Sequence, residues 1–165
     1  MKPFRFRHGD VVARLDPAEA SVLGLLLDQL ELLLEADADD VAGDPVLERL
    51  LPAGHRGDPA AAADYRELTE ASLRSGKADD LATLRATLPD GGGEVRLDPE
   101  QAAAWLRTTN DLRLALGTRL EISDETEPPE DFADDEDQQL AVYYWLTALQ
   151  GSLVDALVAG RAARK

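Results

Sequence analysis

A chain of 165 residues is long enough for one domain, and a domain of this size buries roughly 70% of the surface that its unfolded chain exposes. Its 44% hydrophobic and 30% charged residues are typical of a soluble globular protein, and no apolar run approaches the ~20 residues that cross a bilayer. The absence of cysteine excludes disulfides, thiolate metal sites and cysteine nucleophiles. Since the N-terminus also lacks the apolar segment of a secretory signal, we expect a single cytoplasmic domain over residues 1–165.

The chain is acidic, and its charge is distributed unevenly along the sequence. Seventeen Lys and Arg against 33 Asp and Glu give a net charge of −16, which repels nucleic acids and makes direct nucleic-acid binding the less favoured partner class. Residues 121–137 contain ten acidic and no basic residues, which leaves −6 for the rest. Because these like charges repel one another, we expect residues 121–137 to form a mobile loop. Because it lacks the ligand spacing of an EF-hand, we interpret it as solvated and expect no metal or cofactor.

The first expected element is a β-hairpin from Phe4 to Leu15. Two β-compatible runs, residues 4–7 and 11–15, flank a short glycine-containing loop at His8-Gly9-Asp10. Alternation places Phe4 and Phe6 on one face of the strand and the arginines on the other. We therefore expect the arginines to form an exposed sheet face rather than a DNA footprint.

Helical segments are expected next. Asp16, Pro17 and Glu19 form a capping-box pattern that starts a leucine-rich helix from Ala20 to Leu34. Two further Asp-Pro pairs predict a short helix at 45–51 and a helix from Ala60 to about Arg74, which Gly76 ends. A shorter helix through Leu81, Leu84 and Leu88 stops before Pro89. Three glycines at 91–93 then predict a turn, and a third strand follows from Glu94 to Leu97.

The third strand opens a second copy of an earlier pattern. Arg96-Leu97-Asp98-Pro99 repeats Arg14-Leu15-Asp16-Pro17 at an offset of 82 residues, and Gln101 takes the place of Glu19. Common ancestry and independent selection of the same capping signals both explain the repeat. In either case two strand-helix units predict one small antiparallel sheet. We therefore expect a mostly helical α+β fold, with the hairpin and the third strand backed by the helices after Pro17 and Pro99.

A final helix is expected over about Gln138 to Ala159, followed by Gly160 and a basic end. This helix and the one from Ala20 to Leu34 carry much apolar surface, which predicts a homodimer through one of them. Complete burial within a monomer explains the same surface. The candidate interface residues on the final helix are Val142, Tyr144, Trp145, Leu146, Leu149 and Leu153.

No catalytic residues are predicted. The two histidines, His8 and His55, fall in expected loops without a nucleophile or paired acid, so we interpret them as solvated. The Gly91-Gly92-Gly93 run lacks a Walker lysine and dinucleotide spacing, so it predicts a turn and no phosphate site.

The most informative segment runs from Trp105 to Leu120. Its candidate functional cluster is Asn110, Asp111, Arg113, Thr118 and Arg119. On a helix Arg107 and Asp111 lie four residues apart, so a structural pair within the helix explains them. The functional alternative is a ligand-binding or enzymatic site, which requires Arg113 and Arg119 to converge on an anion.

The sequence resembles an actinobacterial family of unknown function whose members include the oxidative-stress transcriptional regulator AosR. The resemblance covers nearly the whole chain. Its most specific part is the run Asn110–Leu120, and the other matching features are Met1–Phe4, Asp16-Pro17 with Glu19, Glu94-Val95 into Leu97-Asp98, Trp105, and Tyr144–Leu146.

The resemblance implies a regulatory protein without enzyme activity that acts through protein contacts, with the transcription machinery as the partner. Genes of this family often lie beside that of the Clp-protease adaptor ClpS, which makes an accessory role in Clp proteolysis a further alternative. The regulator's redox switch is a cysteine pair, and this chain has no cysteine. The resemblance thus implies regulation without that switch.

Overall fold

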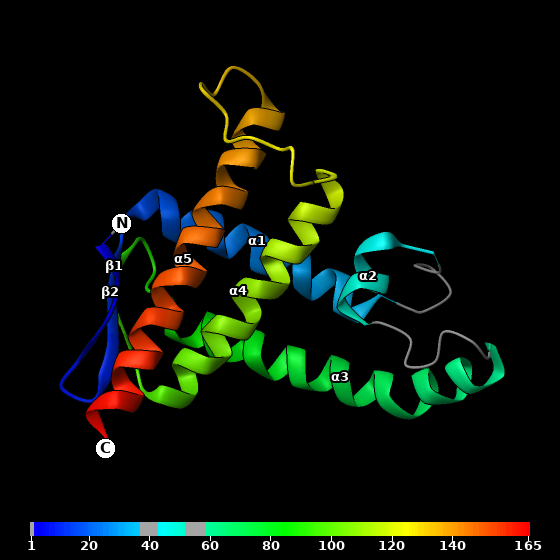
Figure 1. Cartoon of the computed structure of the whole chain (residues 1–165), viewed down its shortest axis with the longest axis horizontal. Coiled ribbons are helices and arrows are strands. Elements are labelled where there is room, and N and C mark those ends of the chain that lie inside the picture. Colours follow the sequence, from blue (N-terminus) through cyan, green and yellow to red (C-terminus); the bar gives the residue numbers. More distant parts are fainter. Residues whose placement is uncertain (1, 37–42, 52–58) are drawn as a thin grey trace.

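The computed structural model describes residues 2–36, 43–51 and 59–165 (Figure 1). Within them the mostly helical α+β class is confirmed, with a three-stranded antiparallel sheet in the order β1-β2-β3. The elements are β1 (Lys2–Arg7), β2 (Asp10–Leu15), α1 (Pro17–Glu35), α2 (Pro45–Leu50), α3 (Pro59–Thr87), β3 (Gly93–Leu97), α4 (Pro99–Arg119) and α5 (Asp135–Ala163). No helix in the described part of the chain has the length and hydropathy required to span a bilayer.

The predicted hairpin is confirmed. His8 and Gly9 join β1 to β2 with φ angles of 52° and 95°, and Arg7 pairs with Asp10 across the turn. Two consecutive positive φ angles are typical of the tight turns that match strand twist. Phe4 and the inward residues of β2 are buried, whereas Arg5, Arg7 and Arg14 are exposed. The sheet therefore has an apolar inner face and an arginine-bearing outer face, as predicted.

Both capping boxes of the repeated pattern form. The backbone N–H of Glu19 donates to Asp16 Oδ1 at 2.8 Å, and that of Asp16 donates to Glu19 Oε2 at 2.8 Å. Asp98 and Gln101 make the same reciprocal pair at 2.8 and 2.9 Å. The strands before these boxes, β2 and β3, are antiparallel neighbours. The prediction that the third strand lies beside the hairpin is therefore confirmed.

The helices on the sheet differ from those predicted. α5, not α1, lies along β1 and covers the inner face together with α4 (Figure 1). The N–H of Phe4 donates to Ser152 Oγ at 3.3 Å, and Gly160 lies against the Phe6 ring, so close that a Cβ there would be 2.9 Å from it. α1 instead packs against α3. The prediction that the helix after Pro17 backs the sheet was wrong, because the repeated local signals do not encode which helix each strand contacts.

Two helix boundaries also differ. α3 runs through Gly76 without a break, so the two helices expected there are one. A helical glycine costs only about 1 kcal/mol, and packing of Leu81 and Leu84 in the core outweighs it. α5 begins before Gln138 because Asp134 accepts from the N–H of Asp137 at 2.9 Å, and it passes Gly160 because that residue packs against β1.

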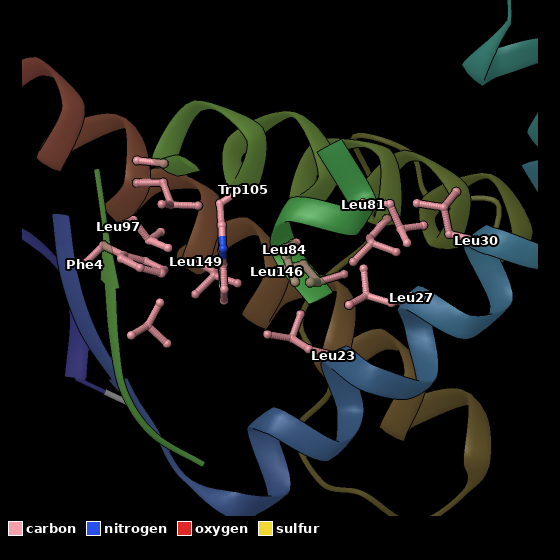
Figure 2. Packing of buried hydrophobic residues seen from close by; sticks show 14 of the residues in the cluster. Phe4, Leu23, Leu27, Leu30, Leu81, Leu84, Leu97, Trp105, Leu146 and Leu149 are labelled. Carbon is pink, nitrogen blue, oxygen red and sulfur yellow. The ribbon is translucent and has the colours of Figure 1, made fainter. Parts of the chain in front are cut away.

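The core lies where the sheet, α1, α3, α4 and α5 meet (Figure 2). Trp105 of α4 is at its centre, completely buried and edge-on to Phe4 with ring centroids 5.4 Å apart. The Trp105 Nε1–H donates to Thr87 Oγ1 of α3 at 2.7 Å. One side chain thus ties the sheet, α3 and α4 together. The leucines around it with no exposed surface are Leu23, Leu27, Leu84, Leu97, Leu146, Leu149 and Leu153.

The acidic segment lies between α4 and α5. Residues 121–134 lie outside helices and strands, whereas Asp135–Asp137, which were expected in the loop, form the first turn of α5. Acidic side chains are favourable there because the helix N-terminus carries partial positive charge. Tyr144 of α5 donates its hydroxyl to the Thr126 carbonyl at 2.8 Å. One point of the segment is therefore attached to α5.

Candidate functional site

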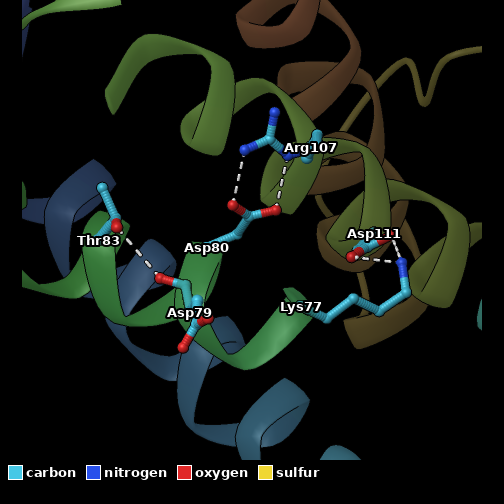
Figure 3. A network of polar contacts seen from close by, with 6 residues as sticks. All are labelled: Lys77, Asp79, Asp80, Thr83, Arg107 and Asp111. Atoms are coloured by element: carbon cyan, nitrogen blue, oxygen red, sulfur yellow. Dashed lines mark hydrogen bonds and ion pairs between the residues drawn. The ribbon is translucent and has the colours of Figure 1, made fainter. Parts of the chain in front are cut away.

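The candidate residues lie on α4, which packs against α2, α3 and α5. On the α3 side, Asp111 accepts two hydrogen bonds from Lys77 Nζ at 2.8 and 2.9 Å, and Arg107 binds Asp80 through two nitrogens at 2.7 and 2.8 Å (Figure 3). The expected pair between Arg107 and Asp111 therefore does not form. Each residue instead takes a partner of opposite charge from α3, so these contacts fasten two helices.

Burial controls the protonation of Asp111. Desolvation raises the pKa of this carboxyl above its ordinary value of 3.8, although the hydrogen bonds and charge of Lys77 oppose the rise. Asp80 adds a smaller repulsion that also raises the pKa. The Asp80 carboxylate in turn raises the pKa of Arg107, which stays protonated.

Two other candidates face α5. Asn110 Oδ1 accepts from Gln150 Nε2 at 3.1 Å. The Arg113 guanidinium donates to the Tyr143 hydroxyl at 3.2 Å, and its central carbon lies 5.8 Å from the centroid of the same ring. Gly117, one turn further along α4, provides the room for Tyr143, because a Cβ there would be 3.0 Å from its ring. Two polar pairs thus join α4 to α5, and we call them the polar seam: Asn110 with Gln150, and Arg113 with Tyr143.

The remaining two candidates do not join this seam. The Thr118 hydroxyl donates to the Leu114 carbonyl of its own helix at 2.8 Å. Arg119 is exposed and borders a shallow depression between α4 and α1, beside Leu26 and Gln29. Arg113 and Arg119 therefore lie against different helices, and the convergence that an anion site requires is not present.

The candidate interface residues of α5 divide into two groups. Leu146, Leu149 and Leu153 have no exposed surface, because they fill the core of the single chain. Val142, Tyr144 and Trp145 are half-buried. Burial within one chain, the alternative to a dimer through this stripe, accounts for the three leucines. The large apolar residues that α5 exposes are Val154 and Val158.

The last groups named from the sequence are the two histidines and the acidic side chains. His8 is exposed in the hairpin turn, and His55 lies outside the described residues. Among the described ranges, no three His, Asp or Glu side chains are grouped to hold a metal ion. Four polar atoms are buried without a partner in this part of the chain: Thr108 Oγ1, Thr109 Oγ1, Arg113 Nε and Trp145 Nε1.

Sequence reasoning missed the partners of the candidate residues. Lys77 and Asp80 come from α3, and Tyr143 and Gln150 from α5. No motif links these positions to α4. The sequence signal was limited to the presence of charged and polar residues on these helices. The arrangement that results is a set of pairs, each joining two helices, and not a convergent pocket.

Comparison of the sequence with known proteins shows its family. A family model described as a domain of unknown function (DUF2017) matches residues 1–157, so the chain belongs to the DUF2017 family. Proteins named oxidative stress regulator AosR from Mycobacterium bovis (strain ATCC BAA-935 / AF2122/97) and Mycobacterium tuberculosis (strain ATCC 25618 / H37Rv) are 39% identical over 134 residues, 72% of this chain and 61% of each relative.

A Mycobacterium leprae relative that also bears the AosR name is 35% identical over 171 residues, which cover 90% of this chain and 79% of that protein. The match spans about three fifths of the length of the M. bovis and M. tuberculosis relatives. No solved structure matches the chain significantly. The predicted family resemblance is thus confirmed.

Replacing Asp111 with asparagine is expected to change the pH dependence of stability. Because the folded pKa of Asp111 is raised, the folded chain binds more protons than the unfolded chain between pH 3.8 and the folded pKa. The contribution of Asp111 to the free energy of unfolding therefore falls as the pH rises through this window. The free energy of unfolding of the wild type minus that of Asp111→Asn should decrease with pH and then level off.

Urea denaturation of both proteins from below pH 3.8 to neutral pH measures this difference. The same comparison, with and without Asp111→Asn, is repeated in a background that carries Lys77→Met. Since Lys77 lowers the pKa of Asp111, its removal should widen the pH window and increase the decrease. If the free energy of unfolding of the wild type minus that of Asp111→Asn instead rises with pH, the ion pair with Lys77 and not burial determines the pKa of Asp111.

Proposed function

We propose that this chain is a non-catalytic regulatory protein that acts through protein contacts, with the transcription machinery as its partner. The observation that carries the proposal is its 39% identity to proteins named oxidative stress regulator AosR. Four polar residues of α4 agree with this function, because each pairs with a neighbouring helix and none of these pairs forms a reactive cluster: Arg107, Asn110, Asp111 and Arg113.

The charge supports a protein partner over a nucleic acid. A net charge of −16 raises the free energy of approach to a phosphate backbone, and the effect is largest at low salt. The same net charge lowers the free energy of approach to a partner protein with a basic surface. Regulation of transcription would then operate through a protein that itself contacts DNA or the polymerase.

We further propose that this activity does not depend on oxidation of the chain itself. The sequence contains no cysteine, and Met1 is its one sulfur-containing residue. Thiol oxidation is the reversible step on which redox sensors rely. Any response to oxidants would therefore arise in the partner or in the amount of this protein.

Affinity capture with the purified, tagged chain from a lysate of its native host, followed by quantitative mass spectrometry, tests both parts. Tag alone is the control. We expect enrichment of RNA polymerase subunits or of a transcription initiation factor. Enrichment confined to proteins outside transcription, such as Clp components, would contradict the proposed partner class.

The second arm treats only the purified chain with hydrogen peroxide and removes the oxidant before capture. The enrichment of partners should stay the same, because the chain has no thiol to oxidise. Loss of the partners after this treatment would contradict regulation without a redox switch, while leaving the partner class intact.

A further inference from the structure

The outer face of the three-stranded sheet is uncovered. α4 and α5 pack on the inner face, and within the described residues no helix packs over the opposite one. The outer face contains an open hollow of about 470 Å³. The apolar side chains at its floor are Pro3 and Val12, and its charged borders are Arg5, Arg7, Arg14 and Glu94.

Arginines outnumber carboxylates on the described part of this face. Arg96 forms ion pairs with Asp10 at 3.1 Å and with Glu94 at 3.2 Å, so both of these carboxylates already have a cationic partner. Arg5, Arg7 and Arg14 are exposed and make no ion pair with any residue that the structure describes. In a chain with a net charge of −16, this face is a local concentration of positive charge.

The acidic segment of the same chain has the complementary chemistry. Residues 121–137 contain ten acidic and no basic residues. Phe132 lies among them with 66% of its surface exposed, flanked by Glu130, Asp131 and Asp134. An aromatic ring surrounded by carboxylates matches an apolar floor bordered by guanidinium groups. Arginine also stacks favourably on aromatic faces.

The segment does not reach the sheet of its own chain. It joins the C-terminal end of α4 to the N-terminal end of α5, whereas β1 contacts α5 at Ser152 and Gly160 (Figure 1). At a rise of 1.5 Å per residue, Ser152 lies about 26 Å along the helix from Asp135. The hollow is, in addition, on the side of the sheet that faces away from α5. A segment that fills it must come from a second molecule.

We propose that copies of this chain associate by docking the acidic segment of one copy on the outer sheet face of another, with Phe132 in the hollow among Arg5, Arg7 and Arg14. The contact joins two different surfaces, so it is heterologous. It is small and strongly charged, and contacts of that kind are transient and sensitive to salt. This association is a property of the chain alone and does not depend on the transcription partner.

Analytical ultracentrifugation over concentrations from about 1 μM to about 1 mM tests the proposal. We expect association above the 17.9 kDa monomer in about 0.15 M salt, where a Debye length of about 8 Å screens the repulsion between the net charges of two copies but not the contact itself. In about 1 M salt, where the Debye length is about 3 Å, the association constant should fall by about tenfold or more. A monomer at every concentration in about 0.15 M salt would overturn the proposal, as would association that is unchanged in about 1 M salt.

Two variants separate the halves of the contact. The sheet variant combines Arg5→Glu, Arg7→Glu and Arg14→Glu, and the segment variant combines Glu130→Lys, Asp131→Lys and Phe132→Ser. All six positions are exposed, so both variants should fold, and circular dichroism is the measurement that checks it. Neither variant should associate with itself. Mixed together they should form a one-to-one complex, because one retains the segment and the other retains the sheet face.

A control variant, Leu25→Ser with Leu32→Ser, removes the apolar side chains that α1 exposes, by 63% and 70% of their surface. It should associate like the wild type. If this variant is monomeric while the sheet variant still associates, the copies meet through α1 and the proposal is wrong. A mixture of the sheet and segment variants that stays monomeric would contradict it as well.

Discussion

Replacing Trp105 with alanine is expected to remove about 3–5 kcal/mol from the free energy of unfolding. The Trp105 side chain has no exposed surface, touches Phe4 of the sheet and donates to Thr87 of α3. The cavity left by the indole would be bordered by the sheet and two helices, which cannot all move inward together. Since whole domains are stable by about 5–15 kcal/mol, the loss is a large fraction of the total.

Urea denaturation followed by far-UV circular dichroism measures this loss, and two phenylalanine variants divide it into parts. Trp105→Phe keeps a ring beside Phe4 but loses the hydrogen bond to Thr87, which is worth about 0.5–1.5 kcal/mol. Trp145→Phe is the matched control, because Trp145 is half-buried and its Nε1 has no partner in the described chain. An effect of Trp145→Phe as large as that of Trp105→Phe would refute the central role of Trp105.

Replacing Gly92 with alanine is expected to destabilise the chain by roughly 2–5 kcal/mol, the combined cost of a left-handed residue and of overpacking. Gly92 has a φ of 84°, and a Cβ there would be 2.7 Å from the carbonyl carbon of Asp16 and 2.8 Å from the nitrogen of Pro17. These are backbone atoms at the start of α1. They can move only by disturbing the capping box of Asp16 and Glu19.

Gly91→Ala is the matched control for this effect. Gly91 also has a positive φ, 68°, but a Cβ there meets nothing within 4 Å. It should cost only about 1–2 kcal/mol, the conformational part alone. Thermal unfolding of the two variants compares them directly. Equal melting temperatures would show that the turn can move away from α1, and that the close approach at Gly92 does not constrain the fold.

The glycine run shows how far local sequence reasoning extends. Three consecutive glycines at 91–93 predict a turn before a strand, because positive φ angles cost glycine little, and all three adopt them. The sequence does not reveal that only Gly92 touches the backbone of Asp16. That distinction depends on β3 lying beside β2, a contact between residues about 80 positions apart.

For the candidate site on α4, the sequence likewise predicts where the residues lie on the helix but not which residues they contact. The positions of Asn110, Asp111 and Arg113 on one helix follow from its capping box and period. Their partners, Gln150, Lys77 and Tyr143, come from α5 and α3. Charge and hydrogen-bonding capacity limit the type of each partner but leave its identity open. The expected pair of Arg107 with Asp111 was wrong for this reason, since Arg107 binds Asp80 and Asp111 binds Lys77 across the contact with α3.

The sequence by itself determined the elements whose signals are local: the hairpin at His8-Gly9, both capping boxes, and the alternation that exposes the arginines of β1. Backbone dihedral preferences and hydrogen bonds between neighbouring residues are sufficient to specify these. The tertiary structure alone decided that α5 covers the sheet, that α3 continues through Gly76, and that the leucines of α5 fill the core. Apolar burial is non-directional, so many pairings of leucine-rich faces satisfy the same sequence pattern, and only close packing of the whole chain selects one.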